Sequence, residues 1–134
     1  MIWTEINPEG NFDSWDKTKL KEAKGGRYSN DVGKALFENN QIILWEIILA
    51  PFERLPFRRH RNNYSCTCFT DGLALLRNIN GKISLLRMTR GDHYYVECDV
   101  EEIVQDFENI GENTIKIAVV EEKVKPKPTP QKKS

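Results

Sequence analysis

Apolar and polar residues alternate with a period of two over short stretches of this chain, and turn-forming residues separate these stretches. A period of two is the pattern of β-strands, whose successive side chains point to opposite faces. The longest apolar stretch, Gln41 to Ala50, is rich in isoleucine and ends at a proline, which favours a buried strand over a helix. Within it, we expect Trp45, Ile47 and Leu49 to face inward. Ile48 would face outward, where another surface would cover it.

The next stretch, Leu49 to Thr70, carries most of the candidate chemistry. Its prolines, Pro51 and Pro56, would bracket a turn, and one polar-faced strand would follow. One face of that strand would present a cation, an imidazole, an amide, a phenol and two thiols, from Arg58, His60, Asn62, Tyr64, Cys66 and Cys68. The alternation therefore predicts a pocket lined by polar groups.

Turn residues divide the remaining chain into short strands. Asn80-Gly81 lies between two apolar runs, Leu73 to Ile79 and Lys82 to Met88. This is a strong hairpin signal, and it predicts a type I′ turn with positive φ at both turn residues. Further turn signals follow at residues 90–92 and 109–111. About eight strands joined in this way predict an all-β sandwich or barrel closed by antiparallel pairing.

The N-terminal residues differ from this pattern. Residues 1–11 contain a proline and a glycine and predict an irregular or edge segment. A short helix should follow, capped by Asp13 or Ser14 and ended by Gly25-Gly26.

The C-terminal residues also differ, because three prolines alternate with lysines and other polar residues after Glu122. Such a composition favours a solvated, polyproline-like chain. We therefore divide the chain into an N-terminal extension with a short helix (1–29), a barrel (30–122) and a disordered Lys/Pro tail (123–134).

Charge and composition exclude several classes of partner. Residues 1–122 carry 15 basic and 20 acidic side chains, and an acidic body of this kind is a poor surface for nucleic acid. The sequence has no apolar stretch long enough for a membrane span and begins without the pattern of a signal peptide. Three cysteines without a secreted spacing agree with a cytoplasmic protein, in which they would be small buried hydrophobic residues.

Several phrases of residues 30–122 resemble those of the small bacterial single-domain cupins, also described as RmlC-like. They are SNDVGKALFENN, WEIILAPFERLPFRRH, the Gly91-Asp92 turn and QDFENIGENT, in this order. The resemblance implies a cupin double-stranded β-helix, a jelly-roll barrel, and commonly a homodimer. It says much less about activity, because one fold hosts many functions.

The resemblance also implies a metal site, from which this chain departs. The family's motifs place a glycine, two histidines and a carboxylate in the first motif and a third histidine in the second. Carried over to this sequence, the glycine position is Phe52, the histidine positions are Arg58 and His60, and the carboxylate position is Tyr64. Gln105 stands at the last histidine position. Only His60 is retained among these four ligand positions, so we expect no conventional metal site and no cofactor.

Arg58 decides the chemistry that remains. A guanidinium keeps its charge and offers no lone pair, so it repels a cation and instead suits a carboxylate or phosphate. We therefore expect a small, anionic metabolite to bind in the barrel through Arg58, His60, Tyr64, Gln105 and Cys66. The first interpretation is thus a binding protein without enzymatic activity.

Two other interpretations stay open at this point. One is a divergent cupin enzyme, an oxygenase or isomerase acting on a small carboxylic acid with Fe, Zn, Ni or Mn, and with Cys66 recruited as a ligand. The other is a structural or interaction barrel that is filled, in which Arg58 pairs with a carboxylate such as Asp106 or Glu53.

Overall fold

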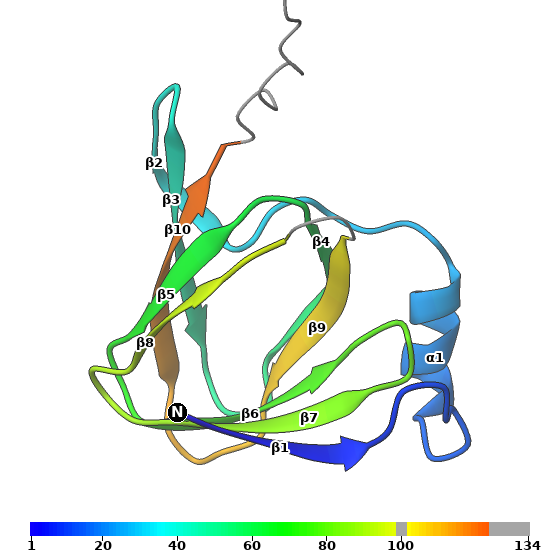
Figure 1. Ribbon diagram of the computed structural model, residues 1–134. Helices are drawn as coiled ribbons and strands as arrows, with labels where there is room; N and C mark the ends of the chain where they lie inside the picture. Colours follow the sequence, from blue (N-terminus) through cyan, green and yellow to red (C-terminus); the bar gives the residue numbers. More distant parts are fainter. Residues whose placement is uncertain (99–101, 124–134) are drawn as a thin grey trace, which may run out of the picture.

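Two five-stranded antiparallel sheets form a barrel in the computed structural model, which describes residues 1–98 and 102–123 (Figure 1). Sheet A has the order β1-β7-β6-β9-β4, with β1 at Ile2–Asn7, β7 at Ile83–Met88, β6 at Gly72–Arg77, β9 at Ile103–Asn109 and β4 at Arg54–His60. Sheet B has the order β2-β3-β10-β5-β8, with β2 at Lys34–Glu38, β3 at Ile42–Leu49, β10 at Ile115–Glu122, β5 at Tyr64–Cys68 and β8 at His93–Val96. The all-β prediction is confirmed. The described residues hold ten strands rather than about eight, because residues 2–7 form a regular edge strand and the predicted polar-faced strand is divided into β4 and β5.

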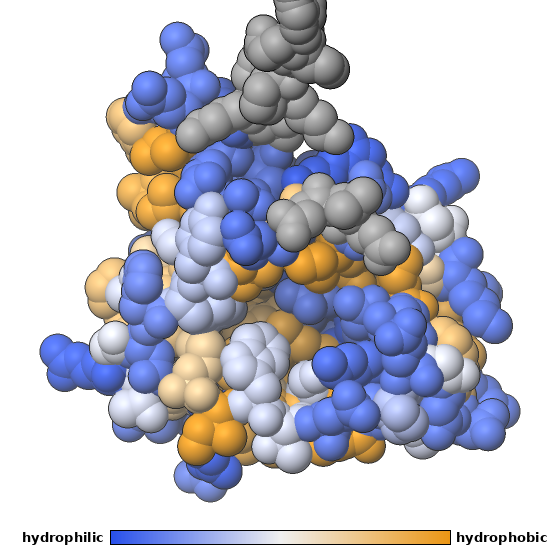
Figure 2. All heavy atoms as spheres, in the orientation of Figure 1, coloured by the Kyte–Doolittle hydropathy of each residue, from blue (hydrophilic) through white to orange (hydrophobic). Residues whose placement is uncertain are grey.

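The main core lies between the two sheets. Alternation along β3 is as predicted: Trp45, Ile47 and Leu49 are buried, while Ile48 is 52% exposed. The centre of the face seen in Figure 2 is hollowed and shows hydrophobic side chains within a hydrophilic surround. Ile48 lies on the outer face of sheet B, and the homodimer expected to cover it stays a prediction.

A second core joins the helix to the outer face of sheet A. Helix α1, Lys17–Lys24, begins after Asp16, whose carboxylate accepts hydrogen bonds from the backbone N–H groups of Thr18 and Lys19. The predicted caps, Asp13 and Ser14, were therefore wrong by two or three residues. The predicted end is confirmed, because Gly25 is the C-cap. Of the predicted tail, residues 124–134 lie outside the described residues, and no helix within the described part is long and apolar enough to cross a membrane.

Trp15 precedes the helix and anchors this second core. Its ring stacks on Phe57 of β4 with 6.2 Å between ring centroids, and its indole N–H donates to the carbonyl of Gly81 at 2.9 Å. Ala23 of α1 and Val104 of β9 are buried in the same cluster. These contacts fix the outer face of β4, and so they fix which β4 side chains remain for the interior.

A bulge in β4 sets the direction of the candidate site. Leu55 is opposite Phe107 and Arg58 is opposite Gln105, so three steps on β4 match two on β9. The extra residue reverses the alternation: Phe57 faces the helix, and Arg58 and His60 then face the interior. Pro56 therefore lies inside β4 at this bulge, and the prediction that it closes a turn was wrong.

The predicted strand through residues 58–68 is two strands. β4 ends at His60 in sheet A, the chain crosses at residues 61–63, and β5 begins at Tyr64 in sheet B. Five of the six residues predicted on one face still share the interior, because Arg58, His60, Tyr64, Cys66 and Cys68 are all buried. Asn62 differs: it lies in the crossing, and its amide donates to the carboxylate of Glu121 at 2.6 Å.

The hairpin between β6 and β7 is present, but its turn differs from the predicted type I′. Gly81 alone takes a positive φ, of 105°, while Asn80 does not. The loop is longer than two residues, since the N–H of Gly81 donates to the carbonyl of Asn78 and the N–H of Asn78 donates to that of Lys82. Only one residue of such a loop needs the left-handed conformation.

Candidate functional site

Three strands bring the predicted site residues together at the interior. β4 supplies Arg58 and His60, β5 supplies Tyr64 and Cys66, and β9 supplies Gln105. Gln105 is directly opposite Arg58 in the ladder, so the two side chains share a face. The rings of His60 and Tyr64 stack with 4.9 Å between their centroids.

Arg58 is a buried cation in this cluster. Its residue is 4% exposed, and Nη1 donates a hydrogen bond to the backbone carbonyl of Val32. Nε is also buried and finds no hydrogen-bond partner among the residues that the structure describes. Burial lowers the pKa of Arg58 to about 10, so the guanidinium still carries its charge at neutral pH. Part of the donor capacity of the guanidinium is therefore left for another partner.

Neither carboxylate that was considered as a partner pairs with Arg58. Asp106 binds Arg54 and Arg77 instead, each at 2.7 Å, and it also accepts the backbone N–H of Arg77 at 2.7 Å. The carboxylate of Glu53 accepts the backbone N–H of Ala50 at 2.7 Å. Asp106 follows Gln105 on β9, and its ion pairs lie on the opposite face of the sheet from the interior. Within the described residues, the filled-barrel interpretation therefore lacks the ion pair on which it depended.

The groups around Arg58 are neutral. Burial, followed by the charge of Arg58, lowers the pKa of His60 to about 3. Burial raises the pKa of Tyr64 well above its usual value and that of Cys66 to about 12. Tyr94 of β8 hydrogen-bonds with Cys66, and its pKa is raised as well. A single positive charge thus sits among an imidazole, phenols and a thiol that are all uncharged.

His60 should make the protein acid-sensitive in a specific range of pH. Its pKa in the folded state is about 3 against an ordinary 6.5, so only the unfolded chain binds the proton between these values. The free energy of unfolding then falls as the pH drops from about 6.5 toward 3. The variant His60→Phe keeps a ring against Tyr64 but has no group that titrates. Between pH 7 and pH 4.5, its free energy of unfolding, measured by urea denaturation, should fall by about 2 kcal/mol less than that of the wild type. Equal losses in the two proteins would show that His60 is not held neutral.

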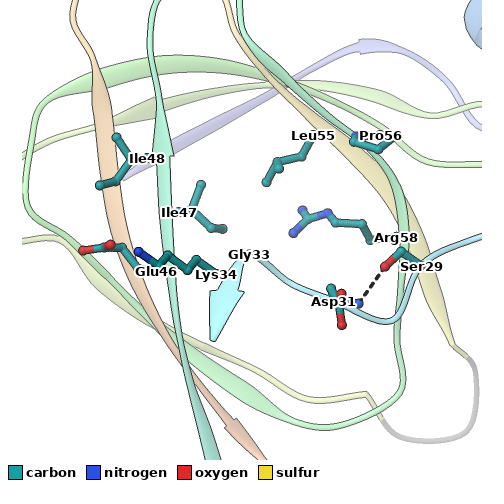
Figure 3. A pocket seen from close by; sticks show the side chains of 10 residues that line it. All are labelled: Ser29, Asp31, Gly33, Lys34, Glu46, Ile47, Ile48, Leu55, Pro56 and Arg58. Carbon is teal, nitrogen blue, oxygen red and sulfur yellow. Dashed lines mark hydrogen bonds between the residues drawn. The ribbon is translucent and has the colours of Figure 1, made fainter. Parts of the chain in front are cut away.

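A pocket of about 420 Å³ opens beside Arg58, between β3 and β4, and we call it the side pocket. Its apolar walls are Ile47 and Ile48 from β3 and Leu55 and Pro56 from β4. Figure 3 shows the Arg58 side chain reaching from β4 into this space, with Leu55 beside it and Ile47 across from it. A pocket of this size with few polar groups is the usual form of a small-molecule site.

The segment before β2 closes the rim of the side pocket. The hydroxyl of Ser29 accepts the N–H of Asp31 at 3.0 Å, and the carbonyl of Ser29 accepts the N–H of Arg59 at 2.8 Å, which ties the segment to β4. Gly33 lies against β3 so closely that a Cβ atom there would stand 2.5 Å from the carbonyl oxygen of Glu46. Asp31, Lys34 and Glu46 supply the charged groups of the rim.

The side pocket and the predicted site overlap at Arg58. His60, Tyr64, Cys66 and Gln105 lie in the interior cluster and do not line the side pocket. The rim residues Asp31 and Lys34 were not predicted. Asp31 lies in a non-repetitive segment, which has no periodicity from which to infer a direction, and Lys34 is the first residue of the short strand β2. Glu46 offered a signal, since it is the one charge within the apolar run of β3.

The sequence and the fold were compared with those of known proteins. No family model matches the chain, and no curated protein matches it. A cupin domain from Bordetella pertussis Tohama I superposes with a TM-score of 0.61 at 20% identity, over 75% of this chain and all of that one. The chain has a cupin fold. An RmlC-like cupin family protein from Methanocaldococcus jannaschii (TM-score 0.54, 15% identity, 72% of this chain and 84% of that one) has the same double-stranded β-helix.

A third cupin-like structure agrees with these two. It is a conserved protein with a double-stranded β-helix domain from Klebsiella pneumoniae, with a TM-score of 0.54 and 18% identity over 72% of this chain and 81% of that one. Likenesses at these identities establish the architecture, so the chemistry of this chain has to be argued from its own residues.

Phe52, the residue at the expected glycine position of the first motif, takes a φ of 71°, a conformation that glycine adopts freely. The assignment of Arg58 and His60 to the histidine positions of that motif stays a prediction.

The residues in the metal slots do not fit a divalent cation. His60 offers one imidazole nitrogen, while Arg58 brings a positive charge into the position of another ligand. The phenol of Tyr64 is neutral, and Gln105 can offer only an amide oxygen. Within the described part of the chain, no three His, Cys, Asp or Glu side chains lie together in a way that could hold a metal ion.

Proposed function

We propose that this cupin binds a small anionic metabolite at Arg58, without a conventional metal site. The observation that carries the proposal is the buried guanidinium, which is 4% exposed and forms no ion pair with a described carboxylate. Removing a charge from water is costly unless an opposite charge or several hydrogen bonds replace the water. An anion in the side pocket would supply that opposite charge.

The surroundings of Arg58 suit an anion and not a cation. His60 is held neutral, and the charge of Arg58 contributes to that. Tyr64 and Cys66 keep their protons because burial raises their pKa values, so they do not cancel the positive charge. A bound carboxylate or phosphate would meet a planar fork that presents parallel N–H groups.

A thermal-shift screen tests the proposal. Acetate, benzoate, inorganic phosphate and sulfate are tested at matched ionic strength with the wild type and with Arg58→Met. At least one anion should raise the melting temperature of the wild type, by an amount that corresponds to about 2.7 kcal/mol at a concentration of 100 Kd, and should leave Arg58→Met unchanged. For acetate, benzoate and sulfate, whose own charge is constant in this range, the shift should be the same from pH 6 to pH 8, because Arg58 and His60, with pKa values of about 10 and about 3, do not titrate there.

Arg61→Met is the matched control for this screen. Arg61 is one residue beyond His60, its side chain is 55% exposed, and it pairs with Glu102. Its replacement removes a surface charge and should leave the anion response intact. If every anion shifts the wild type and Arg58→Met equally, the anions act on the surface and the proposal is wrong.

A further inference from the structure

We propose that the anion bound at Arg58 is an alkyl or aryl monocarboxylate, whose uncharged apolar body occupies the side pocket. This inference rests on the proposed function, because it needs Arg58 to be the group that binds the charged head. It adds the chemical class of the ligand, which we infer from the residues of the walls and the rim of the side pocket rather than from Arg58.

The walls of the side pocket select an apolar body. Arg58 reaches into the side pocket from β4, with Leu55 beside it and Ile47 across from it, and Ile48 and Pro56 complete the apolar lining (Figure 3). Ile48 is 52% exposed and so has apolar surface to bury against a ligand. A ligand whose head reached Arg58 would have its next few atoms against these side chains, where burial of apolar surface is favourable.

The rim of the side pocket selects against a second negative charge. Two carboxylates, Asp31 and Glu46, stand there with one ammonium group, Lys34. Lys34 and Glu46 are direct partners in the β2–β3 ladder, so the positive charge has a carboxylate close to it. The outer end of a dicarboxylate or of a phosphate ester would therefore meet a rim whose balance is negative. A monocarboxylate presents only its apolar end there.

The free edge of the guanidinium fits a carboxylate head. Nη1 is engaged by the carbonyl of Val32, while the buried Nε on the other edge has no partner among the described residues. A planar carboxylate needs two N–H groups of one edge, and a guanidinium presents such a pair in one plane. A carboxylate head would take up the donor capacity that Nε leaves unused.

NMR titrations of the full chain with two matched series test the inference. The first series is butanoate, pentanoate and hexanoate, and the second is pentanedioate and hexanedioate. Affinity should rise by about fourfold per methylene in the first series, which is the increment expected for a buried CH₂ group. Hexanedioate should bind at least about tenfold more weakly than hexanoate, because its second carboxylate faces Asp31 and Glu46.

Two variants assign these effects to the walls and the rim. Ile48→Ser should reduce the gain per methylene, whereas Leu36→Ser, which removes a leucine exposed to 50% outside the side pocket, should not. Glu46→Gln should narrow the difference between hexanedioate and hexanoate while leaving the affinity for hexanoate within about twofold, since Glu46 opposes only the second charge.

The outcomes separate this inference from the proposed function. One outcome is that phosphate or the dicarboxylates bind the wild type but not Arg58→Met, while the monocarboxylates bind neither protein. In that case the proposed ligand class is wrong, and the proposal that Arg58 binds an anion is retained. Equal affinity across the first series also overturns the ligand class. If no anion binds in an Arg58-dependent manner, both proposals are wrong.

Discussion

Replacing Arg58 by methionine should make the ligand-free protein more stable while abolishing its response to anions. Methionine fills a similar volume without a charge, and the replacement of buried charged groups by apolar ones often stabilises a protein by about 1–4 kcal/mol. Loss of the hydrogen bond to the Val32 carbonyl opposes this gain by about 1 kcal/mol. We therefore expect the free energy of unfolding to rise by up to about 3 kcal/mol in urea denaturation.

The opposite signs of the two effects make this test specific. A guanidinium that served only the architecture would cost stability when removed, as buried polar groups with satisfied partners do. Destabilisation by Arg58→Met, together with no anion response in the wild type, would identify a structural arginine. Arg61→Met, at the exposed neighbour, should change stability by no more than about 0.5 kcal/mol.

Replacing Asp106 by asparagine should destabilise the protein by about 3–5 kcal/mol, the cost of breaking a buried ion pair by removing one partner. Asp106 is fully buried and holds both Arg54 and Arg77 at 2.7 Å. Arg54 also binds Glu22 of α1 at 3.0 Å, so the same substitution weakens the attachment of the helix to sheet A. Urea denaturation followed by far-UV circular dichroism measures the loss.

Glu108→Gln is the matched control for Asp106→Asn. Glu108 binds Arg77 at 2.9 Å on the same strand, but its side chain is 20% exposed, so water can replace part of the interaction. We expect a loss of about 1 kcal/mol or less. A similar loss of unfolding free energy in both variants would mean that the buried Asp106 contributes no more to stability than the partly exposed Glu108.

The sequence was sufficient for the barrel and for the direction of the site residues. Period-two alternation correctly placed Trp45, Ile47 and Leu49 inside and Ile48 outside. The interior direction of Arg58 and His60 was also correct, although they share no strand with Tyr64. The chain crosses from β4 to β5 over residues 61–63, and the even-numbered side chains of β4 after the bulge and of β5 still point into the interior. Alternation along the sequence therefore predicts the correct face for these residues, although it treats two strands as one.

The electrostatic partners could not be predicted in the same way. Asp106 was a plausible partner for Arg58 because the family pattern sets it beside Gln105, which is opposite Arg58. Adjacent residues of a strand face opposite sides, and the choice between the two faces depends on the register of β9 against β4. That register depends in turn on a bulge, and the sequence signals it only through Pro56. Asp31 at the rim of the side pocket was missed because it comes from a segment that has no repeating pattern.

The bulge in β4 has a consequence for how this barrel can evolve. A single-residue deletion between Leu55 and Arg58 would remove the extra residue and restore regular pairing with β9. Arg58 would stay opposite Gln105 and His60 opposite Ile103, so both side chains would keep facing the interior. This part of β4 can therefore change in length by one residue without moving the binding chemistry to the solvent side, whereas a point substitution of Arg58 removes the charge itself.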